Sequence, residues 1–416
     1  MRYIDLFAGA GGFSEGFKRA GFESVAHVEV DQAACFTLKT RLAYYYLTEN
    51  NKSDIYVKYL KGEINREQLY SYIPARILES VINLQIGHKN NHIIFEIIKK
   101  LNKRKDIDII LGGPPCQAYS IIGRARDGNG MEGDPRNYLY LQYGRFLKQY
   151  TPKLFVFENV FGLLSANKGN YFRNIKRYFR CLGYIVEPFI VNGNQFGVLQ
   201  NRRRVIIIGW RKDIGISVNI LTNQCNFNFK VSSIFEDLPK LCAGGGKNKY
   251  LTYTFGINDY LRFAKIRNGI NVLTQHISRP HTEQDKEIYR ITVEKWKRDR
   301  RRLDYNDLPE RLKNHNNRES FLDRFKVVAD DLSWSQTVVA HIAKDGHYYI
   351  HPDIEQNRSI SVREAARLQS FPDDYYFEGI REGQIRTSAF RQIGNAVPPL
   401  MIEKIAASIK HLLQNS

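Results

Sequence analysis

Residues 3–12 read YIDLFAGAGG, a short apolar segment that runs directly into three glycines within four positions. The apolar part has the length of a buried β-strand, and a helical pattern begins at about Phe13 and stops at Gly21. A strand, a glycine-rich turn and a helix N-terminus together predict a site for a nucleotide or another anion. The glycines let the backbone approach a ligand closely, and the helix end offers free N–H groups. A tight structural turn without a ligand is the alternative.

Strand-length apolar segments continue along the first 212 residues, with helical patterns between several of them. They lie at about 25–30, 107–111, 154–157, 184–186 and 205–208. This alternation predicts an open α/β sheet with helices on both faces. Glu29 ends the second strand, where its carboxylate can accept hydrogen bonds from both hydroxyls of a ribose. Turn and carboxylate together indicate a nucleoside-containing cofactor but leave NAD and S-adenosyl-L-methionine both open.

The composition indicates a folded protein with an anionic partner. Of the 416 residues, 62 are Lys or Arg and 43 are Asp or Glu, which gives a net charge of +19. Such a surplus favours nucleic acid, although it can also serve solubility alone. The apolar residues, 43% of the chain, suffice for a large core, and no run of about 18 apolar residues predicts a membrane span. Five cysteines without a C-x-x-C pair exclude a disulfide scaffold or zinc ribbon and favour a reducing, cytoplasmic compartment.

The pattern changes twice along the chain. Residues 40–105 are rich in Tyr, Lys and Asn, and we interpret them as an insertion without assignable chemistry. From Lys212 to about Ile350 the chain is polar and carries a basic run at 297–302, which predicts a separate domain. From Ser359 the chain is compact again and ends in an amphipathic helix.

A thiol follows the predicted strand at 107–111. Pro114 and Pro115 stiffen the backbone before Cys116 and Gln117. This position is the carboxyl end of a parallel strand, where open α/β sheets bind their ligands. A reactive cysteine fits the position better than a structural one, which remains the alternative.

Charged side chains adjoin two other predicted strands. Glu158 follows the strand at 154–157, where burial would favour the protonated, donating form of its carboxyl; a solvated glutamate is the alternative. Arg202, Arg203 and Arg204 enter the strand at 205–208, so the first and last share one side. A basic surface run is the alternative for the arginines.

In their order along the chain, six segments resemble the motifs of the DNA cytosine-5 methyltransferases. The segments are residues 5–12, Pro115-Cys116-Gln117, Glu158-Asn159-Val160, Gln200-x-Arg202-x-Arg204, 363–372 and Gly394-Asn395-Ala396-Val397. The resemblance spans residues 1 to about 211 and 359–416. The family's acidic motif after the third strand has no clear counterpart, because the segment at 40–105 obscures it.

This resemblance implies a Rossmann-like, S-adenosylmethionine-dependent methyltransferase sheet, mostly parallel, with helices on both faces. Residues 1–212 and 385–416 would form one discontinuous catalytic domain, and residues 213–384 a smaller target-recognition domain. Double-stranded DNA would lie between the two domains.

The resemblance also implies a division of roles. Cys116 would attack C6 of a flipped-out cytosine, Glu158 would contact N3, Arg204 would contact O2, and Arg202 would orient the site. The loop Ser120 to Arg136 would close over the base. Residues from the predicted turn, the second strand and the C-terminal motifs would bind S-adenosyl-L-methionine: Asp5, Phe7, Ala8, Gly9, Gly12, Glu29, Pro115, Leu139, Asn395, Ala396 and Val397.

Other functions remain open at this stage. An RNA (tRNA) cytosine-5 methyltransferase on the same scaffold and a catalytically silent DNA-binding relative are the rivals, and a dinucleotide oxidoreductase would leave Cys116 unexplained. We expect no metal, since His88, His92 and Glu96 fit an exposed helix face better than a metal site. We further expect a monomer on DNA, no membrane partner, and a bacterial or archaeal cytoplasm shared with the chromosome. A cognate restriction endonuclease that acts on the same site is a candidate partner.

Overall fold

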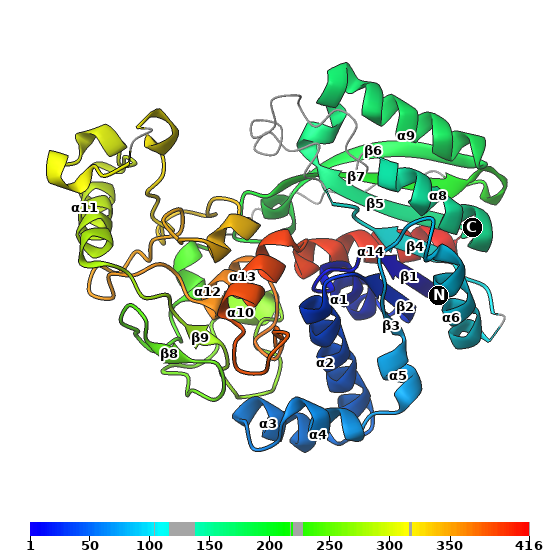
Figure 1. Ribbon diagram of the computed structural model, residues 1–416, viewed down its shortest axis with the longest axis horizontal. Helices are drawn as coiled ribbons and strands as arrows, with labels where there is room; N and C mark the ends of the chain where they lie inside the picture. The colour runs from blue at the N-terminus through cyan, green and yellow to red at the C-terminus, as the bar shows by residue number, and fades with distance from the viewer. Residues whose placement is uncertain (104, 116–137, 217, 219–227, 316–317, 416) are drawn as a thin grey trace.

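A computed structural model describes residues 1–103, 105–115, 138–216, 218, 228–315 and 318–415 (Figure 1). A seven-stranded sheet forms its larger part, in the order β3-β2-β1-β4-β5-β7-β6. The strands are β1 (Arg2–Leu6), β2 (Glu23–Glu29), β3 (Val81–Asn83), β4 (Ile109–Gly112), β5 (Leu154–Val160), β6 (Tyr184–Asn192) and β7 (Arg203–Arg211). The pairs from β3 to β5 are parallel, and β7 runs antiparallel to both of its neighbours. This confirms the predicted mostly parallel α/β sheet.

Helices cover both faces of the sheet because its strands are apolar on both sides. Leu154 and Val156 of β5 pack into one core with α1 (Gly12–Arg19) and α14 (Pro399–Gln414). The alternating residues Phe155 and Phe157 pack into the opposite core. That second core also contains residues of α6 (Asn91–Asn102), α8 (Leu139–Tyr150) and α9 (Asn170–Cys181).

The segment interpreted as an insertion contributes more to the sheet than its sequence predicts. Helix α2 (Gln32–Glu49) is followed by the short helices α3 (Ser53–Lys61), α4 (Arg66–Ser71) and α5 (Ala75–Glu79). The chain then forms β3, which pairs with β2, and α6. Strand β3 has only two buried residues, Val81 and Ile82, so no alternating pattern reveals it.

The remaining residues form the smaller lobe on the left of Figure 1. It contains α10 (Asp259–Phe263), the paired strands β8 (Gly246–Lys247) and β9 (His276–Ile277), and α11 (Glu283–Asp299). Helix α11 packs on a small core of its own with Leu303, Tyr305 and Phe325. Helices α12 (Val362–Leu368) and α13 (Arg386–Asn395) join this lobe to α14.

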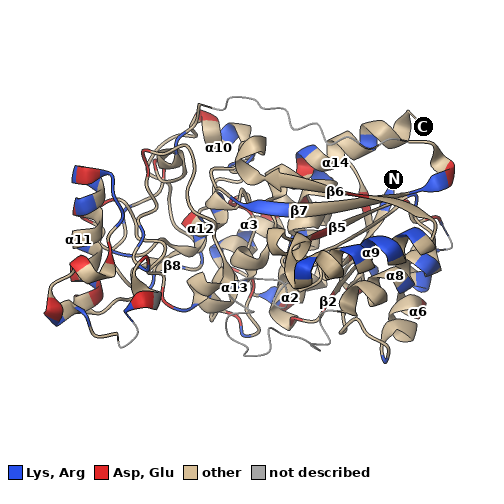
Figure 2. Ribbon diagram, turned by 90° about the horizontal axis from the view of Figure 1, so that it is seen from above, with Lys and Arg blue, Asp and Glu red and all other residues tan. Residues whose placement is uncertain are grey.

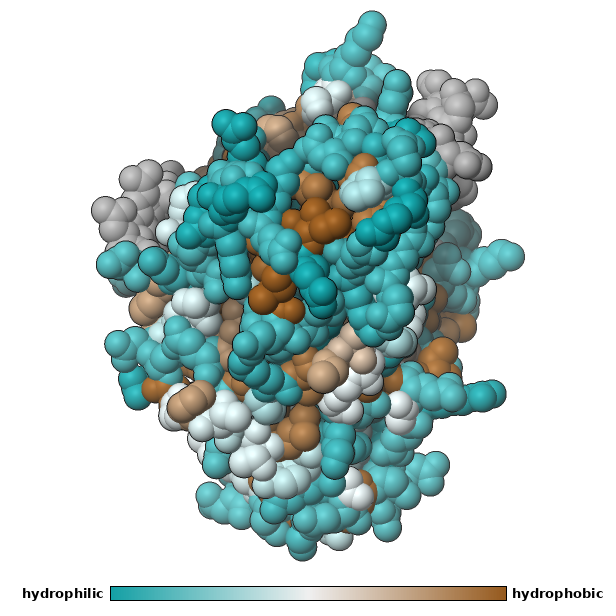
Figure 3. All heavy atoms as spheres, turned by 90° about the vertical axis from the view of Figure 1, so that its left-hand side faces the viewer, coloured by the Kyte–Doolittle hydropathy of each residue, from teal (hydrophilic) through white to brown (hydrophobic). Residues whose placement is uncertain are grey.

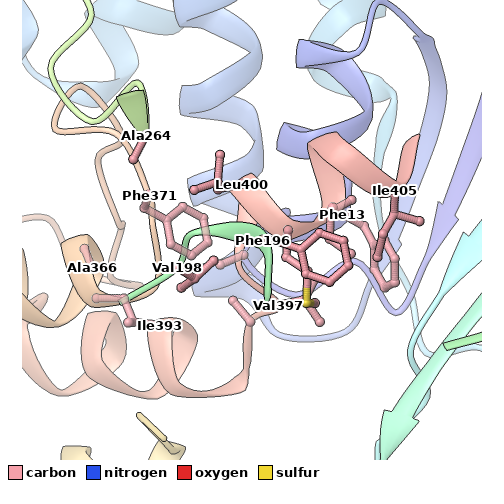
Figure 4. Packing of buried hydrophobic residues seen from close by; sticks show 14 of the residues in the cluster. Phe13, Phe196, Val198, Ala264, Ala366, Phe371, Ile393, Val397, Leu400 and Ile405 are labelled. Carbon is pink, nitrogen blue, oxygen red and sulfur yellow. The ribbon is translucent and has the colours of Figure 1, made fainter. Parts of the chain in front are cut away.

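A continuous core links the lobe to the sheet. Figure 4 shows Phe371 and Leu400 near Phe196, Val198 and Ile393, from segments far apart in the sequence. Part of the chain at 213–384 therefore shares its packing with α1 and α14. Among the helices that the structure describes, none combines the length and apolarity that crossing a membrane requires.

Candidate active site

The glycine-rich turn between β1 and α1 leaves an open space above Gly9. Phe7, Gly9 and Gly11 have positive φ values of 55°, 54° and 80°, so the turn winds through the left-handed region. Among the residues that the structure describes, and apart from the chain neighbours of Gly9, no heavy atom lies within 4 Å of a Cβ built on Gly9. Phe7 is half-buried, and Ala8 is anchored by its N–H, which donates to the Val28 carbonyl at 3.1 Å. The turn thus has the form of a cradle that a ligand can enter.

Glu29 closes one end of this cradle. Its Oε2 accepts from the Gly9 N–H at 2.7 Å, and its Oε1 accepts from the N–H groups of Val30 and Asp31 at 2.8 Å. Burial raises the pKa of Glu29, while these hydrogen bonds act in the opposite direction. A carboxylate fixed beside an open glycine fits the ribose of a nucleoside cofactor.

Asp5, near the end of β1, is buried beside the first turn of α1. Its side chain is fully buried, and Oδ2 accepts from the Ser14 hydroxyl at 2.6 Å. Burial raises the pKa of Asp5 to about 7. The hydrogen bond with Ser14 connects Asp5 to the first turn of α1.

Gly12 serves contact with the C-terminal segment. A Cβ on Gly12 would lie 2.2 Å from the Val397 carbonyl oxygen, so only glycine allows this approach. Ala396 and Val397 are buried, whereas Asn395 is exposed. The glycine-rich turn and the segment 395–397, both predicted to bind the cofactor, are therefore neighbours. Leu139, another predicted cofactor residue, is half-buried at the start of α8.

The second half of the site lies at the ends of β4 and β5. Arg204 Nε and Glu158 Oε1 form an ion pair at 2.8 Å, with both side chains mostly buried. A Cβ on Gly113 would lie 2.9 Å from Glu158 Oε2. Asn159 Nδ2 donates to the Pro114 carbonyl at 3.4 Å. The Gly113-Pro114-Pro115 segment thus runs beside the paired Glu158 carboxylate, with Pro115 exposed.

Cys116 and the loop Ser120 to Arg136, the expected nucleophile and lid, lie outside the described residues.

The three consecutive arginines around the start of β7 have separate contacts. Arg202 is buried and donates through Nη1 to the Val338 carbonyl at 2.7 Å and through Nη2 to the Gly394 carbonyl at 3.3 Å. Arg203 packs over the Phe161 ring at 3.8 Å, and Arg204 pairs with Glu158. Arg202 therefore ties β7 to two distant segments of the chain.

Buried polar side chains that the sequence patterns missed support this junction. Gln200 Nε2 donates to Gln369 Oε1 at 3.2 Å, and Gln369 Nε2 donates to the Ile393 and Ala396 carbonyls at 2.8 and 3.2 Å. On α12, Arg363 and Arg367 are fully buried; Arg367 pairs with Asp237 and Asp373, both at 2.5 Å. In the sequence, Arg363 and Arg367 resemble the charged residues of an ordinary surface helix. Only the apolar residues around them hint at burial.

The expected exposed face at 88–96 carries no metal-site geometry. His88 precedes α6, and His92 and Glu96 are exposed on it. Within the part of the chain that the structure describes, no three His, Cys, Asp or Glu side chains come together as metal ligands would.

Comparison with known proteins gives consistent matches over the whole chain. A family model for C-5 cytosine-specific DNA methylases matches residues 1–67 and 80–411. Type II methyltransferase M.Bpa9945I of Bacillus paralicheniformis is 39% identical, with 99% of each chain covered. Type II methyltransferase M.DdeI of Desulfomicrobium norvegicum is 31% identical, with 100% of this chain and 90% of that protein covered. A crystal structure of a prophage-encoded E. coli protein assigned as a DNA modification methyltransferase has a TM-score of 0.65 at 21% identity, with 100% and 99% of the two chains covered, and supports the fold.

Proposed function

We propose a mechanism from one premise: this chain belongs to the C-5 cytosine-specific DNA methylase family. It is a DNA (cytosine-5-)-methyltransferase, and its methyl donor is S-adenosyl-L-methionine. The proposal is that it acts on cytosine within a specific sequence of duplex DNA and that Cys116, Glu158 and Arg204 carry the reaction.

Cys116 is the proposed nucleophile. Although it lies outside the described residues, it directly follows Pro115, and the preceding Gly113 runs beside Glu158. A thiolate is the reactive form of cysteine. Its addition to C6 forms a carbon–sulfur bond and moves the electron pair of the C5–C6 double bond into the ring, so C5 becomes nucleophilic.

Glu158 and Arg204 would stabilise the charge that this addition creates. Negative charge develops on N3 and O2, and preorganised donors at those atoms lower the barrier. The 2.8 Å ion pair holds both side chains in one place. Arg204 can donate to O2 of the ring, and Glu158 can donate to N3 once its carboxyl carries a proton, which offsets the negative charge on N3. After methylation, a general base takes the C5 proton and the Cys116 sulfur leaves, which restores the aromatic ring. Arg202 acts indirectly, by fixing the start of β7.

The described residues fit the cofactor. Glu29 would accept hydrogen bonds from the ribose hydroxyls, and Gly9 leaves space for the nucleoside. Phe7, Ala8, Gly12, Pro115 and Leu139 would line the same pocket, with Asn395, Ala396 and Val397 closing it and Asp5 supporting the turn from below. Bound S-adenosyl-L-methionine supplies the electrophilic methyl group that C5 accepts.

The target base must leave the duplex, because atoms of a stacked base cannot reach a side chain at the sheet edge. We propose that the loop Ser120 to Arg136 closes over the flipped base and that residues 213–384 read the sequence. Lys and Arg residues on α9 and β7 form part of the +19 surplus available to phosphates (Figure 2). Phosphate contacts would make binding fall steeply with salt.

The named relatives are Type II methyltransferases, so we further propose a role in restriction–modification, with a cognate endonuclease for the same site. In this role the enzyme acts as a monomer on DNA in the bacterial or archaeal cytoplasm, with the chromosome.

The observation that carries the mechanism is the ion pair between Glu158 and Arg204. The pair lies beside Gly113, which precedes Pro115 by two residues and Cys116 by three. The test is transfer of labelled methyl to duplex DNA and to tRNA, with product analysis for 5-methylcytosine. We expect label in duplex DNA only, full loss in Cys116→Ala with DNA binding retained, and a covalent adduct on duplex carrying 5-fluorocytosine at the target. Label confined to tRNA would favour the RNA enzyme, and turnover by Cys116→Ala would remove Cys116 as the nucleophile.

A further inference from the structure

A pocket of about 140 Å³ lies on the smaller lobe, where that lobe meets the segment before β7. It is bounded by α11, by the basic run that follows α11 and by the segment 325–336. Its lining includes Asn201, Trp296, Arg301, Arg302, Trp334 and Ser335. No residue named above for catalysis or cofactor binding lines this pocket.

The pocket is joined directly to the strand that carries Arg204. The Asn201 N–H donates to the Ser335 carbonyl at 2.9 Å, and the Ser335 N–H donates to the Leu199 carbonyl at 3.0 Å. Three residues of extended chain span at most about 11 Å, so Asn201 lies within that reach of Arg204. Successive base steps are about 3.4 Å apart, so a separation within this reach covers at most roughly three base pairs. DNA bound with its cytosine at Glu158 would therefore place neighbouring base pairs near the pocket.

Large apolar side chains at the pocket are exposed to water. Trp334 is 46% exposed and Leu332 is 42% exposed, while Trp296 is fixed by its Nε1–H, which donates to Asp331 Oδ1 at 3.1 Å. Figure 3 views this end of the molecule, where apolar side chains lie in hollows between hydrophilic ridges. An exposed apolar group with a polar rim is typical of a binding surface.

One arginine at the pocket differs from its neighbours. Arg298, Arg300 and Arg302 pair with Asp299, Asp331 and Asp323 at 2.8, 2.6 and 3.4 Å. Arg301 is exposed and has no carboxylate within ion-pair distance among the residues that the structure describes. Its guanidinium is therefore available as a donor. The planar fork of arginine matches O6 and N7 of guanine in the major groove, and that contact distinguishes guanine from the other bases.

We propose that this pocket reads one base of the recognition sequence, with Arg301 donating to O6 and N7 of a guanine and Trp334 covering the adjacent apolar surface of the DNA. This role depends on the proposed function, since it requires DNA bound with the target cytosine at Glu158. It adds to that function a specificity-determining residue and the base that the residue recognises.

The experiment compares Arg301→Ala with Arg298→Ala, which removes the same charge from the same basic run without lining the pocket. Each protein methylates a random-sequence duplex library, and bisulfite sequencing identifies the methylated sites. We expect wild type and Arg298→Ala to require guanine at one position near the target. Arg301→Ala should accept other bases there, with the kcat/KM ratio between cognate and substituted sites falling roughly 10- to 100-fold. Trp334→Phe and Trp334→Ala should relax the same position in that order.

Three results would overturn the assignment. A uniform loss of methylation on all sequences in Arg301→Ala, with a shallower salt dependence of binding measured by anisotropy, would make Arg301 a phosphate contact. An unchanged site preference would show that the pocket reads no base. Relaxation at a position that holds no guanine would exclude the proposed contact. If wild type methylated no cytosine in duplex DNA, the proposed function itself would fail and this role with it, which separates the two failures.

Discussion

The Val397 carbonyl oxygen stands 2.2 Å from the position that a Cβ on Gly12 would occupy, so the glycine-rich turn and the segment before α14 meet backbone to backbone. This contact joins residues 385 positions apart and brings together two segments that are predicted to bind the cofactor. It also separates two roles that glycines play within one turn: close packing at Gly12 and open space at Gly9.

Gly12→Ala should destabilise the protein more than Gly9→Ala. The new methyl group at Gly12 would force two backbones apart, which costs about 3 kcal/mol of unfolding free energy. At Gly9 the methyl group would contact none of the described parts of the chain, so we expect only the cost of the left-handed φ, roughly 1–2 kcal/mol. Urea unfolding without cofactor measures both. Calorimetric titration with S-adenosyl-L-methionine should show weaker binding in Gly9→Ala. Equal losses of unfolding free energy in the two variants would contradict the assignment of close packing to Gly12 and open space to Gly9.

The sequence predicts the sheet well and its third strand not at all. An apolar run of strand length predicts each of the strands β1, β2, β4, β5 and β7. The glycine-rich turn lies where the sequence predicts it. Strand β3 has three residues, and its place in the sheet depends on pairing with β2. Pairing between distant segments leaves no trace in such a short local pattern.

The site shows the same division between local and long-range information. Glu158 and Arg204 are predicted from motifs near the end of β5 and the start of β7. The antiparallel pairing of these two strands brings their side chains within 2.8 Å of each other. The partners of Arg202 are carbonyls 136 and 192 positions away, so the sequence could not show that its contacts differ from those of Arg204. Cys116 stays a prediction, since it lies outside the described residues.

Arg204→Lys should lose activity with little loss of stability. Lysine keeps the positive charge but lacks the fork that can contact Glu158 and the base together. We expect kcat to fall by about 10²–10³, as when a donor to developing negative charge is removed. The unfolding midpoint should change little, because lysine keeps a positive charge beside the Glu158 carboxylate. Adduct formation on 5-fluorocytosine duplex measures the chemical step directly, and a normal adduct rate would exclude this role. Glu158→Gln should show the same loss.

Arg202→Met should show the opposite behaviour. Methionine fills part of the space but leaves the Val338 and Gly394 carbonyls without these donors, at a cost of about 2–4 kcal/mol. Denaturant unfolding should report this loss. At a temperature where the variant is folded, kcat should fall less than in Arg204→Lys. A stable variant with a 10²-fold lower kcat would instead place Arg202 in contact with the reacting base.

Asp5→Asn should make the free energy of unfolding depend less on pH than it does in the wild type. The pKa of Asp5 is about 7 in the folded protein against 3.8 for an ordinary aspartate, chiefly because of burial. A raised carboxyl pKa means that the folded state binds the proton more tightly. The associated stability is therefore full below pH 3.8 and is lost as the pH rises through about 7. At 1.36 kcal/mol per pKa unit the loss is on the order of 4 kcal/mol. An amide carries no charge at either pH, so Asp5→Asn should gain stability relative to wild type between pH 5 and pH 8. Urea unfolding at both pH values gives the difference, and Glu23→Gln, a surface change on the neighbouring strand, is the control. A difference between Asp5→Asn and wild type that stays constant from pH 5 to pH 8 would mean that Asp5 does not titrate in this range, and that its carboxylate is stabilised by more than the Ser14 hydroxyl.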